Sequence, residues 1–280
     1  MARFTGSGDL ILDGGNEQQA SDLEFTGTGE MRVEGCRYPI VERIVRPGSA
    51  TRVVYTQGNV GLKLNAIAGA VRIEGEVDAR VDGVSGDVWD EGSKSIDIAG
   101  VYGSVYLNGS LKADVRADGV VTVDGGNNVG LDVNGTVELI GSAHIDVELR
   151  SVGEDFGLVV DGCTDVNADV DIYQADGHGV EIEDSKDVSV VGSVAESGQG
   201  AGSFDNVLVT QPTAMTSGGV KIGPLRSRSS GTTTRYGVNI ASGVIDAIVD
   251  AIDFGTAADY GSGTLNNSGT NTRIGTNWQI

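Results

Sequence analysis

Aspartate side chains are frequent in the second half of the chain. Five of the six that fall between positions 165 and 187 could stack on adjacent coils: Asp165, Asp169, Asp171, Asp184 and Asp187. Such a group could hold Ca²⁺ through carboxylate oxygens, and with a nearby arginine or lysine as base it could remove a proton from a substrate. Lys186 is the only lysine between Lys112 and Lys221, and Arg150 is the nearest arginine. The pattern therefore favours a solvated acidic face, with Asp169 and Asp171 as weak cation candidates, over a catalytic site.

The elements that position these aspartates follow a short phrase: glycine, apolar residue, any residue, apolar residue. It begins at Gly61, Gly130, Gly157, Gly179, Gly219 and Gly237. The longest interval between successive phrases after Gly130, from Gly179 to Gly219, has room for one more strand, and Asn206-Val207-Leu208-Val209 lies inside it. A strand phrase that returns about every 20 residues indicates a solenoid. Its two apolar side chains point to one face of a strand, which predicts these core residues: Leu131, Val133, Leu158, Val160, Val180, Ile182, Val238 and Ile240.

The same alternation also fits a β-sandwich, whose turns come every 8–12 residues. The coil-like period of the glycine phrase and an aromatic content of only 5% favour the solenoid. We predict an all-β fold with very little helix, a right-handed parallel β-helix over residues 59–254. Residues 1–58 are predicted to form a separate N-terminal β cap or attachment region. Residues 255–280 are predicted to be a Gly/Thr/Asn-rich tail that docks through its terminal Trp278 and Ile280.

The repeat in this sequence resembles that of a known family. The run His-Gly-Val-Glu-Ile-Glu-Asp-Ser-Lys-Asp-Val-Ser-Val at residues 178–190 resembles the repeat of the right-handed parallel β-helices of the pectate-lyase-like superfamily. That group includes polysaccharide lyases, polygalacturonases and phage tailspikes, and the chain is closest in character to viral tailspikes and virion surface proteins. The resemblance covers residues 59 to about 254 and implies the fold, but one fold hosts many activities.

One histidine matches a catalytic motif in part. Gly177-His178-Gly179 is similar to a short polygalacturonase motif. The same pattern needs an Asn-Thr-Asp phrase and an Asp-Asp pair upstream, and neither occurs here. It also needs an Arg-Ile-Lys phrase, and Val220-Lys221-Ile222 lacks the arginine. We interpret His178 as a corner residue beside a glycine and predict no catalytic residue.

The net charge of −21 comes from 26 Asp and 14 Glu against 14 Arg and only 5 Lys. High Asp with scarce Lys resembles proteins of salt-in halophiles, where molar salt screens a dense acidic surface; the alternative is an ordinary acidic protein. Residues 59–205 carry a net −20, and such a surface disfavours nucleic acid.

The two ends of the chain differ from the middle in charge. Residues 1–58 have a net charge of −2 and residues 206–280 of +1. The cores of protein–protein interfaces are depleted of charged residues but retain arginine. We therefore expect the two nearly neutral ends of the chain to be surfaces that contact other proteins. Arg37, Arg43 and Arg46 are the predicted attachment residues. A repeated building block of this kind is expected to assemble with itself, as a homotrimer or another ring-symmetric oligomer.

Several function classes lack support in the sequence. No apolar run reaches the length of about 18 residues that a membrane span needs. Residues 1–6 lack a signal-peptide core, and Cys36 and Cys163 suggest no disulfide framework or metal site. We expect no membrane insertion, and no cofactor beyond loosely bound divalent or monovalent cations.

The function predicted from these observations is structural and non-enzymatic. The chain would be a virion surface protein, a tail spike, fibre or capsid turret, of a virus with a halophilic host. It would assemble in the host cytoplasm and bind other virion proteins through its N-terminal region. Its acidic β-helix would face outward and meet a host surface glycan or surface-layer protein. The alternative is a carbohydrate-active lyase or hydrolase of the same fold.

Overall fold

The computed structural model describes residues 1–46, 52–199, 204–211, 218–229, 234–256 and 260–275, and the backbone of residues 278 and 279. The chain forms two compact units, Met1–Gly130 and Leu131–Ile280, called unit 1 and unit 2. The described residues contain strands and no helix. No segment among them is therefore a helix that could cross a membrane.

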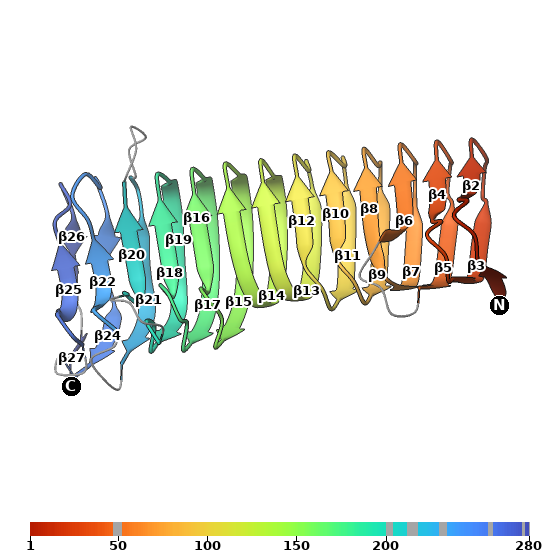
Figure 1. Cartoon of the computed structure of the whole chain (residues 1–280). Helices are drawn as coiled ribbons and strands as arrows, with labels where there is room; N and C mark the ends of the chain where they lie inside the picture. The colour runs from red at the N-terminus through yellow and green to blue at the C-terminus, as the bar shows by residue number, and fades with distance from the viewer. Residues whose placement is uncertain are drawn as a thin grey trace. The chain divides into compact units, whose positions relative to one another are not determined.

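In unit 1 the chain alternates between two columns of parallel strands (Figure 1). The first column holds β1 (Ala2–Phe4), β3 (Gln19–Phe25), β5 (Ile40–Val45), β7 (Lys63–Ala68), β9 (Ala79–Val84), β11 (Ile96–Val101) and the start of β13 (Ala113–Asp124). The second holds β2 (Leu10–Asp13), β4 (Met31–Glu34), β6 (Arg52–Gln57), β8 (Ala70–Glu74), β10 (Val88–Glu91), β12 (Val105–Asn108) and the end of β13.

Unit 2 is built in the same way. One column holds the end of β14 (Asn127–Ile140), then β16 (Leu158–Asp161), β18 (Val180–Glu183), β20 (Val207–Thr210), β22 (Tyr236–Ile240) and β25 (Gly263–Asn267). The other holds β15 (Ala143–Val152), β17 (Thr164–Tyr173), β19 (Lys186–Ala195), β21 (Lys221–Arg228), the pair β23 (Ile248–Val249) and β24 (Ile252–Gly255), and the pair β26 (Arg273–Ile274) and β27 (Trp278–Gln279).

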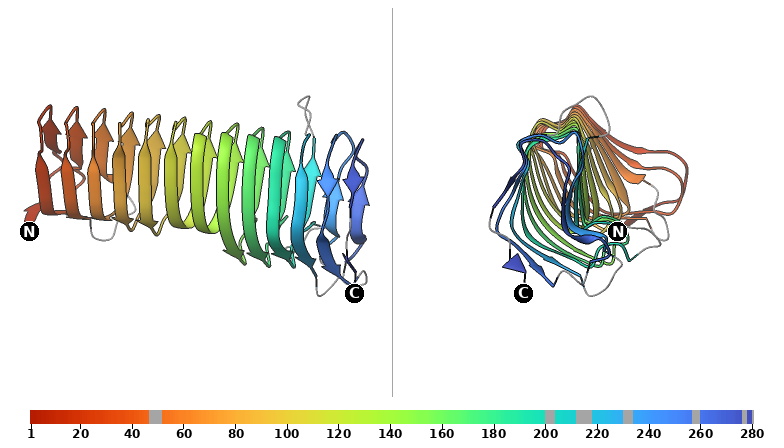
Figure 2. Two further views of the ribbon diagram at one scale, coloured as in Figure 1. Left: turned by 180° about the vertical axis from the view of Figure 1, so that it is seen from behind. Right: turned by 90° about the vertical axis from the view of Figure 1, so that its left-hand side faces the viewer.

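Each strand pairs with the strand one coil away, so each unit is a parallel β-helix (Figure 2). Alternate side chains point inward; in β17 these are Val166, Ala168, Val170 and Ile172, all buried. The eight core residues predicted from the glycine phrase are at most 4% exposed, which confirms them. Burying each such side chain contributes about 1.5–3 kcal/mol, and the stacked rows supply the cohesion that a single coil lacks.

A glycine also follows most strands of one column and forms the corner at which the strand ends. In unit 1 it is Gly14, Gly35, Gly58, Gly75, Gly92, Gly109 and Gly125, and in unit 2 Gly141 and Gly162. All have φ between 54° and 70°, a left-handed conformation that costs glycine little. Eight of these nine, all except Gly125, donate the amide to a carbonyl on the next coil in the described structure, as Gly75 does to Glu91 at 2.8 Å. Asp184 holds the equivalent position after β18 with φ 45°.

The coils extend beyond the predicted range of 59–254. β5 pairs with β7, and β6 with β8, so residues 1–58 are coils of the same kind and not a separate cap. At the other end β25 pairs with β22, and Trp278 of β27 pairs through its backbone with Asp253. The predicted tail therefore also supplies strands. In β25 outward residues alternate with an inward one, Thr264, which is buried although it is polar. Ile280 lies outside the described residues.

Candidate functional site

One outward row of unit 1 stacks arginine and aromatic side chains on successive coils. Arg32 of β4 is level with Tyr55 of β6, and Tyr55 with Arg72 of β8. Trp89 of β10 and Tyr106 of β12 continue the row. Side chains at one register position of neighbouring strands point the same way and interact. We call these five residues the arginine–aromatic column.

The aromatic rings of this column form a fixed surface. Trp89 and Tyr106 have ring centroids 5.7 Å apart and planes within 6° of parallel. Tyr106 is 37% exposed and Trp89 is half-buried. The Arg32 guanidinium lies 4.9 Å from the centroid of the Tyr55 ring. Because ring faces are negative, they attract cations and polarised C–H groups. The Trp89–Tyr106 pair is therefore the part of the column that offers an apolar surface to a ligand, since Tyr55 is only 8% exposed.

A second outward row lies beside the column, two residues further along each strand. Its members, the acid–amide row, are Glu34, Gln57, Glu74, Glu91 and Asn108. The Tyr55 hydroxyl donates to Glu74 at 2.7 Å, and burial together with this bond raises the pKa of Tyr55. Arg72 lies 2.8 Å from both Glu74 and Glu91. Burial alone would lower the pKa of Arg72, but attraction to these two carboxylates outweighs it and raises the pKa. The two rows are thus bonded into one surface.

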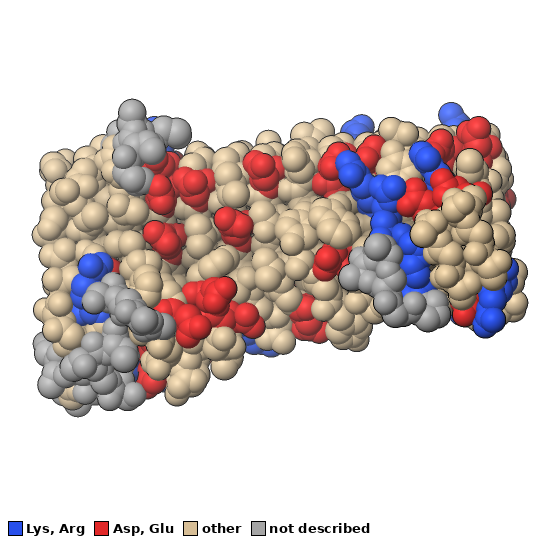
Figure 3. All heavy atoms as spheres, viewed as in Figure 1, with Lys and Arg blue, Asp and Glu red and all other residues tan. Residues whose placement is uncertain are grey.

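The balance of charge on this surface selects a class of ligand. Figure 3 shows basic and acidic side chains intermingled over β4, β6 and β8. Arg32 pairs with Glu34 at 2.7 Å, and Arg52 with Glu30 at 2.5 Å. Because each of these arginines already faces a carboxylate, the surface gains little from a polyanion. Carboxylate and amide groups that accept hydrogen bonds beside ring faces suit a neutral, hydroxyl-rich ligand.

A separate carboxylate cluster lies at a corner of unit 2. Asp161 ends β16 and is level with Glu183, which ends β18. Oxygens of Asp161, Glu183 and Asp184 all lie within 4.8 Å of one another. Burial raises the pKa of Glu183, and the charges of Asp161, Glu181 and Asp184 raise it further. Such a group could hold a cation, or it could act in acid–base chemistry.

The two predicted cation candidates lie on one outward face of unit 2. Asp169 and Asp171 are exposed on β17, and their register neighbours on β15 are Glu148 and Arg150. Arg150 also contacts Glu148 at 3.3 Å. A guanidinium one coil away from Asp171 competes with a cation for that carboxylate. These two aspartates stay weak cation candidates.

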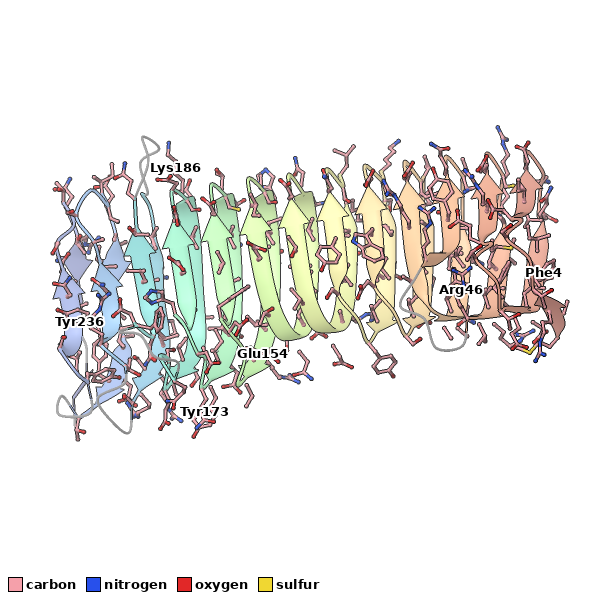
Figure 4. The ribbon with its side chains drawn as sticks, viewed as in Figure 1. Phe4, Arg46, Glu154, Tyr173, Lys186 and Tyr236 are labelled. Atoms are coloured by element: carbon pink, nitrogen blue, oxygen red, sulfur yellow. The ribbon has the colours of Figure 1, made fainter. Side chains whose placement is uncertain are left out.

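The other three predicted aspartates lie apart from them. Asp165 bonds to the Nδ1 atom of His144 at 2.7 Å, and Asp187 is exposed at the start of β19. Asp184 is buried at its corner and joins the carboxylate cluster. Lys186 stands at the same corner, exposed and labelled in Figure 4. The structure therefore does not gather the five aspartates into one calcium-binding group.

His178 has a structural contact. Its Nδ1 atom accepts a hydrogen bond from the backbone amide of Asp205 at 2.9 Å, and its ring packs edge-on against Phe204 at 5.1 Å. An imidazole used in this way holds two coils together, which agrees with its interpretation as a corner residue.

The predicted attachment arginines differ in exposure. Arg37 is exposed, and Arg43 is exposed while bonded to Asp22 at 2.7 Å. Arg46, labelled in Figure 4, is only 8% exposed. It donates to the carbonyls of Arg52, at 2.7 Å, and Gly29. Arg46 is therefore not an exposed anchor, because its guanidinium satisfies carbonyls of its own coils.

The arginine–aromatic column was missed in the sequence although it leaves a signal there. Each member stands three residues before a corner glycine, in the phrases Arg-Val-Glu-Gly, Tyr-Thr-Gln-Gly, Arg-Ile-Glu-Gly, Trp-Asp-Glu-Gly and Tyr-Leu-Asn-Gly. These phrases return once in every coil. Aligning these phrases places the rings in one row. The Gly-apolar-x-apolar phrase of the sequence analysis begins at the start of a strand and does not align the strand ends.

No protein-family model matches the sequence, and no curated protein matches it. Among solved structures, the chain is similar to the A-module of the mannuronan C-5 epimerase AlgE6 of Azotobacter vinelandii, with 11% identity, a TM-score of 0.45, and coverage of 98% of this chain and 91% of that one. It is also similar to tailspike protein 3 of bacteriophage CBA120, with 11% identity, a TM-score of 0.43, and coverage of 100% of this chain and 51% of that one. Both likenesses concern the fold.

Proposed function

We propose that this protein is a non-enzymatic surface component of a virus particle, and that its β-helix binds a neutral glycan through the arginine–aromatic column. The observation that carries the glycan part is the Trp89–Tyr106 pair beside Glu91 and Asn108. A sugar ring presents C–H groups on its faces and hydroxyls on its rim. The rings would take the faces, and the acid–amide row would accept hydrogen bonds from the hydroxyls.

The placement on a virion rests on the composition and on the remaining surfaces. The acidic excess of −21 suits a halophilic environment. Arg37 and Arg43 are exposed on early coils and would join the chain to other virion proteins. Self-association into a homotrimer or another ring-symmetric oligomer would present several columns at once, which multiplies weak glycan affinities. Mass spectrometry of purified particles would test this placement, and absence of the protein from every particle fraction would refute it.

Binding to a panel of immobilised polysaccharides tests the glycan proposal. The wild-type protein is expected to bind at least one neutral polysaccharide. The double variant Trp89→Ala/Tyr106→Ala is expected to lose about 10- to 100-fold in affinity, since each stacked ring contributes about 1 kcal/mol or more. Tyr102→Ala is the matched control, because Tyr102 is 70% exposed on the same unit but lies outside the column. Equal losses in both variants, or binding to uronate polymers alone, would refute the proposal.

A second candidate function is a carbohydrate-active enzyme, favoured by the carboxylate cluster of unit 2. Glu183, whose pKa is raised by burial and by neighbouring carboxylates, would supply the acid that glycoside cleavage needs, and Asp161 would supply the second carboxyl group. Incubation with neutral and uronate polysaccharides, followed by assay of new reducing ends or unsaturated products, tests it. Turnover that disappears in Glu183→Gln and persists in Glu181→Gln would favour the enzyme over the binding protein.

A further inference from the structure

A ladder of buried side chains runs along one inner corner of unit 1. Each member directly follows a corner glycine, and each is at most 1% exposed. The members, which we call the corner ladder, are Cys36, Asn59, Glu76, Ser93 and Ser110. Glu76 is the one carboxylic acid among them. The ladder therefore places a carboxyl group inside the β-helix, away from water.

A second carboxyl group joins the corner ladder from the adjacent strand. Asp90 lies on the inward side of β10 and is 1% exposed. Both of its oxygens accept hydrogen bonds from ladder hydroxyls, one from Ser93 and the other from Ser110. The Ser93 hydroxyl also accepts the backbone amide of Glu76 at 3.3 Å. One hydroxyl group thus connects the two acidic residues.

The side chain of Glu76 is bonded to the coil before it. Its Oε1 atom accepts from Asn59 Nδ2 at 2.8 Å, and the Thr56 hydroxyl is near enough to bond to the same carboxyl group. The Asn59 side chain in turn accepts the backbone amide of Cys36 at 2.8 Å. Glu76 and Asp90 therefore belong to one hydrogen-bonded network that links five successive coils.

No cationic side chain balances these two carboxyl groups among the described residues, since neither takes part in an ion pair there. Asp90 is level with Ile73 and Leu107 of the neighbouring coils, and β7, β9 and β11 turn only apolar side chains inward. Arg46 is buried but donates to backbone carbonyls, and Arg72 pairs with carboxylates of the outward face. An uncompensated carboxylate in an apolar interior is costly, so binding a proton favours the folded coils.

The acidity of both groups agrees with this arrangement. Burial is the main cause that raises the pKa of Glu76 above its usual 4.5 and that of Asp90 above 3.8. The charge of Asp90 adds to the rise for Glu76, and the charge of Glu91 to the rise for Asp90, while the hydrogen bonds that each accepts oppose it. Tyr55 and Glu74, the nearby titratable pair on the outward rows, bond to each other. A carboxyl group whose pKa is raised by folding stabilises the protein fully below its unfolded pKa, and this stabilisation is lost as pH rises through the folded pKa.

We propose that this network makes unit 1 proton-sensitive. Its coils hold together most tightly when Glu76 and Asp90 carry protons, and they loosen as pH rises and the two groups ionise. Ionisation places two like charges in one interior network, where hydrogen bonds compensate them only in part. The strands affected are β6, β8 and β10, which also carry part of the arginine–aromatic column. The inference concerns stability and does not depend on glycan binding.

Equilibrium unfolding of the full chain from about pH 4 to about pH 9 tests this inference in the variants Glu76→Gln and Asp90→Asn. Each amide keeps the shape of the acid and cannot ionise, so each variant is expected to gain stability relative to wild type as pH rises. The unfolding constant of wild type divided by that of the variant is expected to grow by up to about tenfold per pH unit. A ratio that stays constant with pH in both variants would overturn the inference.

A matched control and hydrogen exchange locate the effect. Asp114→Asn removes an exposed carboxylate from β13 of the same unit and is expected to follow wild type at every pH. At alkaline pH the amides of Gly75 and Gly92, which bond to the next coils, are expected to exchange faster in wild type than in Glu76→Gln. The amide of Gly162 in unit 2 is expected to differ less between the two proteins. Equal exchange at Gly75 in both, or a pH-dependent gain in Asp114→Asn as large as in the two variants, would contradict the assignment.

Discussion

At the scale of single residues, ion pairs between coils are the best-defined polar contacts of unit 2. Arg228 of β21 donates to Asp253 of β24 through two nitrogens, one of them at 2.7 Å, and also to the Asp253 carbonyl. These bonds lower the pKa of the Asp253 carboxyl below its usual 3.8, while burial opposes the shift. The strand ladder pairs Asp253 with Arg226, so this contact joins Asp253 to an arginine two residues further along β21.

The Asp253 pair predicts a dependence of stability on pH. Because the pKa of the folded state is lowered, the stabilisation is fully present above pH 3.8 and is lost as pH falls through the lower folded value. Asp253→Asn is expected to cost about 1 kcal/mol near neutral pH, a modest amount because both side chains are one-third exposed. Denaturant unfolding at several pH values measures this, and the two curves are expected to converge toward about pH 2. Curves that stay equally separated would contradict the assignment.

At the scale of elements, the strands could be predicted from alternation alone, whereas the outward rows require the corner-glycine phrases of successive coils to be aligned. Alternation such as Val180-Glu181-Ile182 identifies inward residues within one strand without knowledge of its neighbours. The arginine–aromatic column depends instead on which residues of different coils share a register. Coil length varies, since the successive corner glycines Gly35, Gly58 and Gly75 are unequally spaced, so counting with a fixed period misplaces these residues.

The two chain ends were misjudged for a related reason. The prediction of a separate cap and a tail relied on charge and on polar composition. Strand formation depends on alternation and on a parallel neighbour, and both persist in residues 1–58 and 255–280. Even Thr264, a polar residue, takes an inward place at 8% exposure.

Glycine substitutions test the corner geometry. An added Cβ at Gly75 meets no atom within 4 Å, but its φ of +62° is left-handed. Gly75→Ala is therefore expected to cost about 1–2 kcal/mol from the backbone alone, and Gly75→Asn less, because Asn tolerates this conformation. At Gly86 a Cβ would lie 2.6 Å from the carbonyl carbon of Gly69. Gly86→Ala should cost more, about 3 kcal/mol; equal costs in equilibrium unfolding would contradict this account.

At the scale of the whole molecule, the uneven charge is the dominant feature. Residues 59–205 hold 28 acidic and 8 basic side chains. The acidic side chains also appear over β16, β18 and β20 in Figure 3, with few basic ones among them. Repulsion among exposed carboxylates opposes the compact state, and salt screens it.

The charge predicts how stability responds to salt. The melting temperature is expected to rise from low salt to about 1 M salt, where the Debye length falls to about 3 Å. A chloride series measured with both sodium and potassium checks this. A melting temperature that stays flat or falls would show that the acidic excess is incidental and would remove the support for a halophilic host.

Glycan binding at the arginine–aromatic column is the central claim, and the fluorescence of Trp89 tests it most directly. The sequence has two tryptophans, so Trp278→Phe leaves Trp89 as the sole tryptophan, which can be excited selectively over the tyrosines. We predict that a neutral glycan that binds this variant in calorimetry will shift its emission and protect it from acrylamide quenching, with the same saturation curve. Calorimetric binding that leaves the emission and quenching of Trp89 unchanged would contradict the account.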